Sequence, residues 1–454
     1  MTQSVNPATG AVIHEYTHTT SAEKECILAD AQAAFGSWKY ESYDSRAKTL
    51  RQIAAVIRER KEALATLATQ EMGKPIAQSR DEVEKCARTF DFYAEKGAAM
   101  LADELIKTDA TKSYVHYEPV GVVLAVMPWN FPYWQVLRCA APILMAGNTM
   151  VLKHASNVWG CAMAIDSVFK AAGLPQNLLQ TLLLPSSEVE ALIDHPAVSA
   201  VTFTGSTTAG SKIAEAAGRN IKKQVLELGG SDAYIILEDA DITKAVDICI
   251  RARLVNSGQS CVAGKRFVVV QSKRAAFEKA FTAAMQAATF GDPFDEASRI
   301  GPMARVDLRD ALHEQVTASI AKGAKLLCGG EVPEMTGAYY PPTVLTDVTS
   351  GMPAYEEELF GPVAAIIAAK DEDDAMRLAN DSVYGLGGCI ISEDTARAES
   401  LAARGLQAGN CFVNDAVHSD PNLPFGGTKR SGYGRELGAF GIREFTVVKT
   451  VFIK

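Results

Sequence analysis

The feature that most limits the possible folds of this chain is a change in its hydrophobic period near residue 120. From there on, short apolar runs alternate with stretches of helical pattern. The predicted strands lie at 122–126, 150–152, 200–203 and 234–237, and the predicted helices at 133–145, 161–171 and 208–217. This alternation predicts a parallel sheet covered by helices on both faces. A second α/β series, with strands near 267–270, 364–368 and 389–391, extends to about residue 413.

The two ends of the chain follow other patterns. The first hundred residues are helical in pattern: Ser21 is the expected cap of a first helix, Asp44 or Ser45 caps a second, and 70–101 continues in the same way. β-forming residues are concentrated at 112–117 and again near the C-terminus. With 454 residues the chain is long enough for two or three domains, and no obvious linker separates them.

Composition excludes several classes of protein. The net charge is −9, and no run of Lys and Arg is long enough for a nucleic-acid patch, so neither nucleic acid nor a membrane surface is expected as a partner. The nine cysteines are scattered, without a C-x-x-C pair, which favours a reducing cytosol over a disulfide framework or a metal site. The N-terminal residues do not resemble a signal peptide, and no apolar stretch reaches membrane-spanning length. We expect a cytoplasmic protein.

The stretch 256–266, Asn-Ser-Gly-Gln-Ser-Cys-Val-Ala-Gly-Lys-Arg, is the candidate centre of the chemistry. A thiol is a strong nucleophile only as the thiolate, and its ordinary pKa of about 8.5 leaves little thiolate at neutral pH. Small residues on both sides of Cys261 let backbone and substrate approach the sulfur closely. The alternative is a buried structural cysteine.

A glycine-rich turn at 205–210 is the candidate phosphate-binding site. It follows the predicted strand at 200–203 and opens a helix, so main-chain N–H groups, the Ser206 hydroxyl and the helix dipole point at one spot. It is not the G-x-G-x-x-G fingerprint, and a strand, a glycine turn and a helix are common in any α/β protein.

Two further polar residues occur in strand-like or rigid surroundings. Glu227 stands in an apolar segment that runs into two glycines, where burial would raise its pKa toward the range of a general base; the alternative is a Glu on an edge strand that faces water. Asn130 lies in a loop pinned by prolines, Pro-Trp-Asn-Phe-Pro at 128–132, and can donate an N–H to an oxyanion. The alternative is an Asn that closes a turn.

With these residues in place, the chain resembles the aldehyde dehydrogenase superfamily along essentially its whole length. The matching motifs are 128–132, 205–207, Glu-Leu-Gly-Gly at 227–230, Asn-x-Gly-Gln-x-Cys-x-Ala-x-x-Arg at 256–266, Glu-Glu-Leu-Phe-Gly-Pro-Val at 357–363 and Pro-Phe-Gly-Gly at 424–427. They occur in the family's order. The resemblance implies that the Cys261 thiolate attacks an aldehyde and that the Asn130 amide and the Cys261 N–H hold the oxyanion. Glu227 would activate the water that hydrolyses the thioester.

The resemblance also implies a cofactor site. It assigns the adenosine-side ribose to Lys153, the pyrophosphate to Ser206 and the nicotinamide-side ribose to Glu358, with Phe360 against the nicotinamide. The cofactor-binding set is Trp129, Lys153, Ser156, Gly205, Ser206, Leu228, Glu358 and Phe360. Ser156 stands where the family usually has a glutamate that favours NAD. Because a small neutral hydroxyl neither repels nor excludes a 2′-phosphate, we expect NADP to be preferred and NAD to be used as well.

The fold implied by the resemblance is α/β, with a Rossmann-type cofactor domain (1–102 and 118–227) and an α/β catalytic domain (228–429). A small β oligomerisation element (103–117 and 443–454) completes it, and a homodimer or homotetramer is expected. One departure concerns proton transfer. Cys139 stands where many members carry a lysine that relays protons with the glutamate matching Glu436, which weakens the case for such a relay.

The substrate is expected from a narrower resemblance, to succinate-semialdehyde dehydrogenases. Arg138 and Ser419 match the arginine and serine that bind the distal carboxylate in that group, and Trp134 and Ser260 complete the predicted substrate site. A surface salt bridge is the alternative for Arg138. Val255 replaces a second carboxylate-binding arginine. We therefore expect NAD(P)-dependent oxidation of succinic semialdehyde to succinate, with a broader aliphatic or omega-carboxylated aldehyde specificity as the alternative.

Three rival functions are less consistent with these residues. An acylating enzyme that passes the thioester to coenzyme A does not need the base Glu227. A binding protein that has lost its activity would not need Cys261 and Glu227 together. A cysteine hydrolase leaves Lys153, Ser206 and Glu358 unexplained, and none of the seven His resembles the partner of a Cys–His pair.

Overall fold

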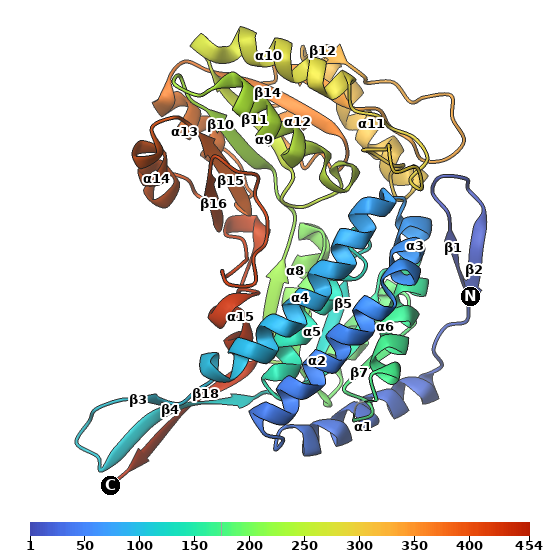
Figure 1. The fold of residues 1–454 in the computed structure, drawn as a ribbon, viewed down its shortest axis with the longest axis vertical. Helices are drawn as coiled ribbons and strands as arrows, with labels where there is room; N and C mark the ends of the chain where they lie inside the picture. Colours follow the sequence, from blue (N-terminus) through green and yellow to red (C-terminus); the bar gives the residue numbers. More distant parts are fainter. Residues whose placement is uncertain (174) are drawn as a thin grey trace.

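The computed structural model describes residues 1–173 and 175–454, and its strands form two large sheets, a small three-stranded sheet and an N-terminal hairpin (Figure 1). The hairpin consists of β1 (Thr2–Val5) and β2 (Val12–Tyr16). Within the described ranges, none of the helices is long and apolar enough to span a membrane.

The six-stranded sheet has the order β17-β9-β8-β5-β6-β7. Its strands are β5 (Val122–Met127), β6 (Thr149–His154), β7 (Leu179–Leu182), β8 (Val198–Thr204), β9 (Lys223–Glu227) and β17 (Gly432–Tyr433). The connecting helices are α5 (Trp134–Met145), η1 (Ser156–Val158), α6 (Trp159–Ala171), η2 (Ser186–Glu188), α7 (Val189–Asp194) and α8 (Thr207–Arg219). All pairings are parallel except that of β17 with β9, as the alternating pattern predicts. A parallel sheet buries its strands on both faces, and β5 and β6 are buried at every position.

The seven-stranded sheet has the order β12-β13-β14-β11-β10-β15-β16. Its strands are β10 (Asp232–Ile236), β11 (Gly264–Val270), β12 (Lys325–Cys328), β13 (Thr343–Thr346), β14 (Val363–Ala369), β15 (Gly387–Ile391) and β16 (Asn410–Val413). Its helices are α9 (Ile242–Leu254), η3 (Val255–Gly258), α10 (Gln271–Gln286), α11 (Val306–Ala321), α12 (Pro353–Glu356), α13 (Glu372–Asn380) and α14 (Thr395–Arg404). The second predicted α/β series is confirmed, with β12 as its one antiparallel edge strand.

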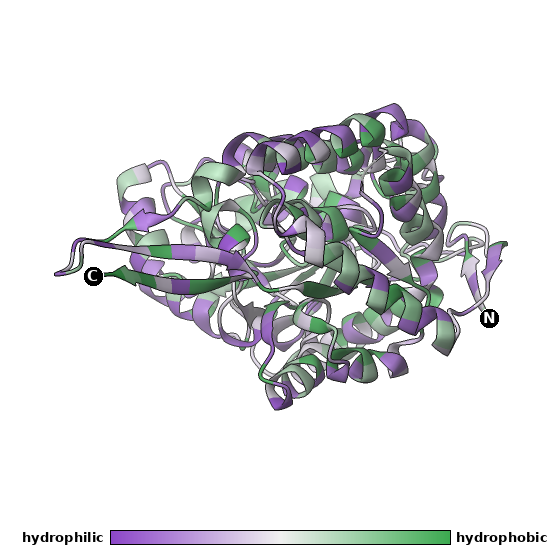
Figure 2. Cartoon of the chain, turned by 90° about the horizontal axis from the view of Figure 1, so that it is seen from below, coloured by the Kyte–Doolittle hydropathy of each residue, from purple (hydrophilic) through white to green (hydrophobic). Residues whose placement is uncertain are grey.

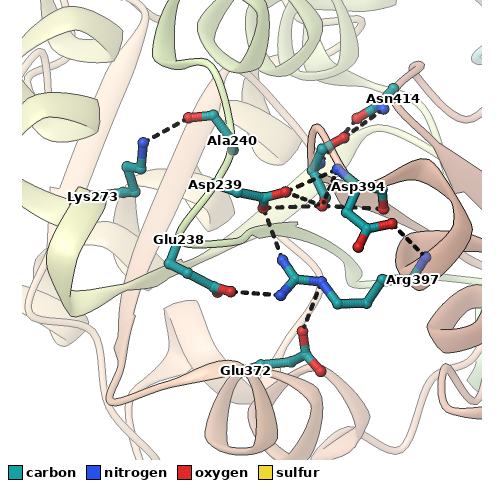
Figure 3. A network of polar contacts seen from close by, with 9 residues as sticks. Glu238, Asp239, Ala240, Lys273, Glu372, Asp394, Arg397 and Asn414 are labelled. Carbon is teal, nitrogen blue, oxygen red and sulfur yellow. Dashed lines mark hydrogen bonds and ion pairs between the residues drawn. The ribbon is translucent and has the colours of Figure 1, made fainter.

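A polar network joins three loops at one end of this sheet (Figure 3). Arg397 of α14 donates to the carboxylates of Glu238 and Asp239, which follow β10, and pairs with Glu372 at the start of α13. Asp239 also accepts the main-chain N–H of Asp394 at 2.9 Å. The network holds the chain reversals after β10 and β15 in place.

Four helices precede the first large sheet: α1 (Ser21–Trp38), α2 (Tyr43–Glu59), α3 (Lys61–Met72) and α4 (Ile76–Met100). The predicted caps were wrong: Thr20 and Ser42 cap α1 and α2. Thr20 forms a capping box with Glu23, which satisfies the main-chain N–H groups of both residues. The expected continuous helix at 70–101 is interrupted after α3, because Gly73 has φ 83° and Pro75 lacks an N–H.

The three-stranded sheet projects from the body as an arm, seen at the lower left of Figure 1. It consists of β3 (Glu104–Leu105), β4 (Lys112–Pro119) and β18 (Thr446–Ile453), and β18 follows η4 (Lys429–Ser431), β17 and α15 (Gly438–Glu444). Figure 2 shows hydrophobic residues along the C-terminal strand, where Val448 and Phe452 are 63% and 50% exposed. The predicted domain limits stay a prediction. The sheets support them, except that β17 returns to the six-stranded sheet from beyond residue 429.

Candidate active site

One cavity of about 670 Å³ holds the predicted nucleophile and the predicted substrate residues. Residues of α4, α5 and α9 line it, together with residues that follow α9 and β16. Cys261, Ser260, Trp134, Arg138 and Ser419 are among these residues. The fold therefore brings these five side chains, which are up to 285 residues apart in sequence, around one space.

The nucleophile loop begins with η3, where three consecutive residues adopt the left-handed conformation. Asn256 and Ser257 both have φ 55°, and Gly258 has φ 75°. A Cβ on Gly258 would lie 2.4 Å from the carbonyl carbon of Gly361, so only glycine fits there. Non-glycine residues in this region cost about 1–3 kcal/mol each and persist only where the surroundings hold them. The tight turn brings the chain from α9 back to Cys261.

Asn130 is tied directly to this loop. Its side-chain Nδ2 donates to the carbonyl oxygen of Gln259 at 3.1 Å, and the Asn256 Nδ2 donates to the Asn130 carbonyl at 2.7 Å. The main-chain N–H of Cys261 makes no hydrogen bond within the part of the chain that the structure describes. The Asn130 amide thus contacts the loop two residues before the unbonded N–H of Cys261, an arrangement that can receive an oxyanion.

Cys261 is half-buried and lines the cavity. Burial raises the pKa of its thiol to about 12, while the positive charges of Lys265 and Arg138 lower it. Because the thiol is protonated at neutral pH in this state, its chemistry requires a group that accepts the proton or charges that favour the thiolate.

Glu227 ends β9 and is only 3% exposed. Within residues 1–173 and 175–454, neither of its carboxyl oxygens has a hydrogen-bond partner. Burial raises its pKa well above the ordinary value, and the charge of Glu436 raises it further. A Cβ on Gly426 would lie 2.9 Å from the Glu227 carboxylate, so the Pro-Phe-Gly-Gly motif makes room for it. A buried carboxyl with a raised pKa suits a general base near neutral pH.

Arg138 forms a buried ion pair with Glu436, so the pairing is not the surface salt bridge considered as the alternative. Burial opposes the charge on Arg138, but Glu436, Glu227 and Cys261 raise its pKa. The guanidinium also lies 5.0 Å from the centre of the Phe425 ring. Arg138 pairs with Glu436 and also lines the cavity. That it binds a substrate carboxylate stays a prediction.

The adenosine side of the predicted cofactor site has the features that an anionic nucleotide requires. Lys153, near the end of β6, is 4% exposed, and its Nζ lies 3.5 Å from the Ser186 hydroxyl. It enters no ion pair among the described residues. Ser156 is exposed at the start of η1. Ser206 caps α8 by accepting the N–H of Ala209 at 3.3 Å, directly after Gly205. A buried ammonium without a carboxylate partner and a free helix N-terminus fit a phosphorylated ribose and a pyrophosphate.

The residues predicted for the nicotinamide side come from loops next to both large sheets: Trp129 follows β5, and Glu358 and Phe360 precede β14. The rings of Trp129 and Phe360 meet edge to face with centres 5.7 Å apart. Glu358 accepts the main-chain N–H of Gly230 at 3.0 Å, and its Oε1 lies 3.3 Å from the Lys265 Nζ. The predicted cofactor residue Leu228 packs in the core, where a Cβ on Gly210 would come within 2.4 Å of it. We retain these residues as a proposed cofactor site.

Lys85 is a candidate that sequence reasoning missed. Its Nζ donates to the Ser419 hydroxyl at 2.8 Å and lies 4.3 Å from the centre of the Trp134 ring. Burial and the charge of Arg138 lower its pKa to about 8, and it has no ion-pair partner in the described chain. In sequence it is one of many basic residues on an amphipathic helix, so only the packing of α4 against α5 distinguishes it.

Comparison with known proteins identifies the family. The family model described as "Aldehyde dehydrogenase family" matches residues 1–451. The succinate semialdehyde dehydrogenase Sad of Escherichia coli, named for NAD(P)+, is 48% identical over 449 residues, which cover 99% of this chain and 97% of that protein. The NADP+-named succinate-semialdehyde dehydrogenase of Mycobacterium leprae is 44% identical over 453 residues, 99% of each chain.

A solved structure extends the similarity to three dimensions. The crystal structure of succinic semialdehyde dehydrogenase from Streptococcus pyogenes in complex with NADP+ matches with a TM-score of 0.97 and 36% identity, and the match covers 100% of both chains. These similarities confirm the predicted α/β fold class with its Rossmann-type cofactor part. The chain belongs to the aldehyde dehydrogenase family.

Proposed function

We propose that this protein oxidises succinic semialdehyde to succinate, with NADP as the preferred cofactor and NAD as a second one. The observation that carries the proposal is a cavity that holds Cys261 together with the hydroxyl of Ser419 and with Lys85, which has no ion-pair partner among residues 1–173 and 175–454. The names of similar proteins in Escherichia coli and Mycobacterium leprae support the same substrate and cofactor.

The chain supplies a nucleophile, an oxyanion site and a base. The Cys261 thiolate adds to the aldehyde carbon, and the new oxyanion receives N–H groups from Asn130 and from Cys261 itself. A nicotinamide cofactor held by Lys153, Ser206 and Glu358 would supply the acceptor for the hydride that the thiohemiacetal loses when it becomes a thioester. Glu227 then takes a proton from a water molecule, whose oxygen replaces the Cys261 sulfur and releases the acid.

The distal carboxylate of the substrate binds to Lys85 and Ser419 at the end of the cavity. Lys85 can donate to a carboxylate without breaking an ion pair, and Ser419 lies within hydrogen-bond distance of the same ammonium. Arg138 adds positive charge near this point although its guanidinium is paired with Glu436. A hydrogen bond between charged groups contributes about 1.5–3 kcal/mol, which is enough to prefer an anionic substrate.

A broader aldehyde specificity is the second candidate. Val255 is 39% exposed and lines the cavity where close relatives are expected to carry a second arginine. Such an apolar wall accepts longer or uncharged aldehydes. Steady-state oxidation of succinic semialdehyde, glutaric semialdehyde, butanal and benzaldehyde, each with NAD and with NADP, tests both candidates. The first requires the highest kcat/KM for succinic semialdehyde with NADP; equal values for butanal would favour the second.

The cofactor preference is tested at Ser156. Its exposed hydroxyl can donate to a 2′-phosphate, whereas a carboxylate at this position repels the phosphate and accepts the ribose hydroxyls of NAD. Ser156→Glu should lower kcat/KM for NADP at least tenfold and raise it for NAD. Better efficiency of the wild type with NAD, or no gain for NAD in Ser156→Glu, would contradict the assignment.

We assign the six-stranded sheet and its helices to cofactor binding, the seven-stranded sheet to catalysis and the projecting arm to self-association as a homodimer or homotetramer. The exposed apolar side chains of β18 support the last assignment. A cytoplasmic location is consistent with scattered cysteines that form no disulfide in the described chain.

A further inference from the structure

Lys265 is a buried lysine whose side chain converges on the nucleophile. It is 0% exposed, and its Nζ donates to the carbonyl oxygens of Ser260 at 2.8 Å and Cys261 at 2.5 Å. The same Nζ lies 3.3 Å from the Glu358 carboxylate. One ammonium therefore contacts both the main chain of the nucleophile and the proposed ribose-binding carboxylate.

A break in strand pairing explains why Lys265 points there. Asp232 of β10 pairs with Gly264 of β11, but the next residue, Ala233, pairs with Arg266, so Lys265 is an extra residue without a partner on β10. Such bulges redirect a side chain and are common next to active sites. The bulge turns Lys265 out of the regular alternation of β11 and toward the preceding loop.

The contact with Ser260 also orients the proposed oxyanion donor. In a planar trans peptide the C=O and the following N–H point in opposite directions. An ammonium that holds the Ser260 carbonyl on one side therefore directs the Cys261 N–H to the other side. This N–H makes no hydrogen bond in the described chain, so it remains available to substrate.

We propose that Lys265 is a positioning residue: it fixes the Ser260–Cys261 peptide, favours the Cys261 thiolate by its charge and holds Glu358 for the nicotinamide-side ribose. This inference rests on the proposed function, in which Cys261 is the nucleophile. A structural lysine that only satisfies two loop carbonyls is the competing explanation, and it predicts a loss of stability without a change in thiol reactivity.

The charged groups that face Cys261 have opposite effects on its thiolate, so removing a positive or a negative charge should change thiol reactivity in opposite directions. Lys265 and Arg138 favour the thiolate, whereas Glu358 and Asp232 oppose it. Below the pKa of the thiol, the rate of alkylation is proportional to the thiolate fraction. Removing Lys265 should therefore slow alkylation, and removing the charge of Glu358 should accelerate it.

The experiment measures iodoacetamide labelling of the Cys261 peptide by mass spectrometry between pH 7 and pH 9, without cofactor. Because an opposite charge within a few ångströms shifts a pKa by about 1–3 units, Lys265→Met should slow labelling about tenfold or more at each pH. In Lys265→Gln, which keeps an N–H donor without the charge, Cys261 should be labelled as slowly as in Lys265→Met. The kcat of Lys265→Gln should be higher than that of Lys265→Met. Glu358→Gln should label faster than the wild type.

Lys273→Met serves as the matched control, since Lys273 lies in α10, beyond the C-terminal end of β11, and donates to the carbonyl of Ala240 at 3.0 Å (Figure 3). Its labelling and kcat should equal those of the wild type. Wild-type labelling rates in both Lys265 variants, with an unchanged KM for NADP, would overturn the inference. Full activity of Cys261→Ser would instead overturn the proposed function, so the two failures are distinguishable.

Discussion

At the scale of single residues, Glu227 and Glu436 are two buried carboxyl groups next to one guanidinium, that of Arg138. Burial raises the pKa of both, and the Arg138 charge lowers the pKa of each. The charge of Glu436 holds the pKa of Glu227 up, and that of Arg138 draws it down. Arg138, one residue before Cys139, is the group that pairs with Glu436.

Glu436→Gln should move the acid limb of the kcat profile to lower pH. A general base works only above its pKa, so activity is lost as pH falls through the raised pKa of Glu227. The variant removes the negative charge of Glu436, which raises the pKa of Glu227. It also frees Arg138, whose positive charge lowers that pKa, so both effects lower the pKa of Glu227. The kcat–pH profile with a saturating aldehyde checks this. An acid limb that moves to higher pH would contradict the coupling.

Lys85→Met should raise KM for succinic semialdehyde at least tenfold and leave KM for butanal nearly unchanged. The loss of a hydrogen bond between charged groups, about 1.5–3 kcal/mol, corresponds to about 10–150-fold. Lys96→Met is the control on the same helix, because Lys96 lies over Phe92 outside the cavity. Arg138→Ala tests the sequence-based prediction in parallel: an equal effect on both aldehydes would refute an anion clamp at Arg138.

The proposed carboxylate site at Lys85 and Ser419 predicts a pH dependence that is specific to anionic substrates. Burial and Arg138 lower the pKa of Lys85 to about 8, with Arg88 in the same direction and Cys86 and Asp420 opposed. As pH rises through this value the ammonium loses its proton, so KM for succinic semialdehyde should rise above pH 8 while that for butanal does not. A parallel rise for both aldehydes would assign the effect to another group.

At the scale of elements, a buried ion pair positions α5, the helix that carries Trp134 and Arg138. Glu82 of α4 pairs with Lys74, and its other oxygen accepts the N–H groups of Tyr133 and Trp134 at 2.8 Å each. These N–H groups belong to the first turn of α5, which has no cap from its own sequence. A carboxylate from another helix therefore fixes where α5 begins.

Glu82→Ala should lower the free energy of unfolding by about 3–5 kcal/mol, because it leaves the Lys74 charge buried without a partner and opens two N–H groups. Lys74→Met should lower the free energy of unfolding by less than Glu82→Ala, since Glu82 still accepts both N–H groups. Denaturant unfolding followed by circular dichroism measures the free energy of unfolding of each variant. Equal costs for the two variants would show that the cap contributes nothing beyond the ion pair.

At the scale of the whole molecule, the arm carries apolar side chains that the monomer does not cover. Val448 and Phe452 lie on β18, which forms an edge of the three-stranded sheet. An exposed edge strand with hydrophobic residues is a site for pairing with another chain. None of the residues that line the cavity belongs to β3, β4 or β18, so the proposed association surface is separate from the cavity.

Val448→Glu should shift the assembly toward a smaller species, measured as molar mass by light scattering after size-exclusion chromatography. Burying a carboxylate in an apolar interface costs several kcal/mol, enough to dissociate a marginal contact. Leu326→Glu, on the edge strand β12, is the control because Leu326 is 40% exposed outside the arm. An unchanged mass for Val448→Glu would exclude β18 as the association surface.

Hydrophobic periodicity alone predicted both α/β series and the β-rich segment that became β4, because buried parallel strands require apolar runs regardless of what packs on them. Motif chemistry selected Cys261, Glu227 and Asn130, and their loop geometry follows from local rules such as the glycine at 258. Helix starts were less predictable, since Thr20 and Ser42 compete with neighbouring polar residues that can also cap.

Only the tertiary structure decided which partners the charged side chains have. Arg138 meets Glu436, Lys85 meets Ser419 and Lys265 meets Glu358 across separations of 298, 334 and 93 residues. No local pattern encodes these pairs, because a charged side chain takes whichever partner the packing of distant elements brings within hydrogen-bond distance. The sequence thus determined which groups carry the chemistry, and the packing determined their charge states and neighbours, since pKa values depend on burial and on the nearest charges.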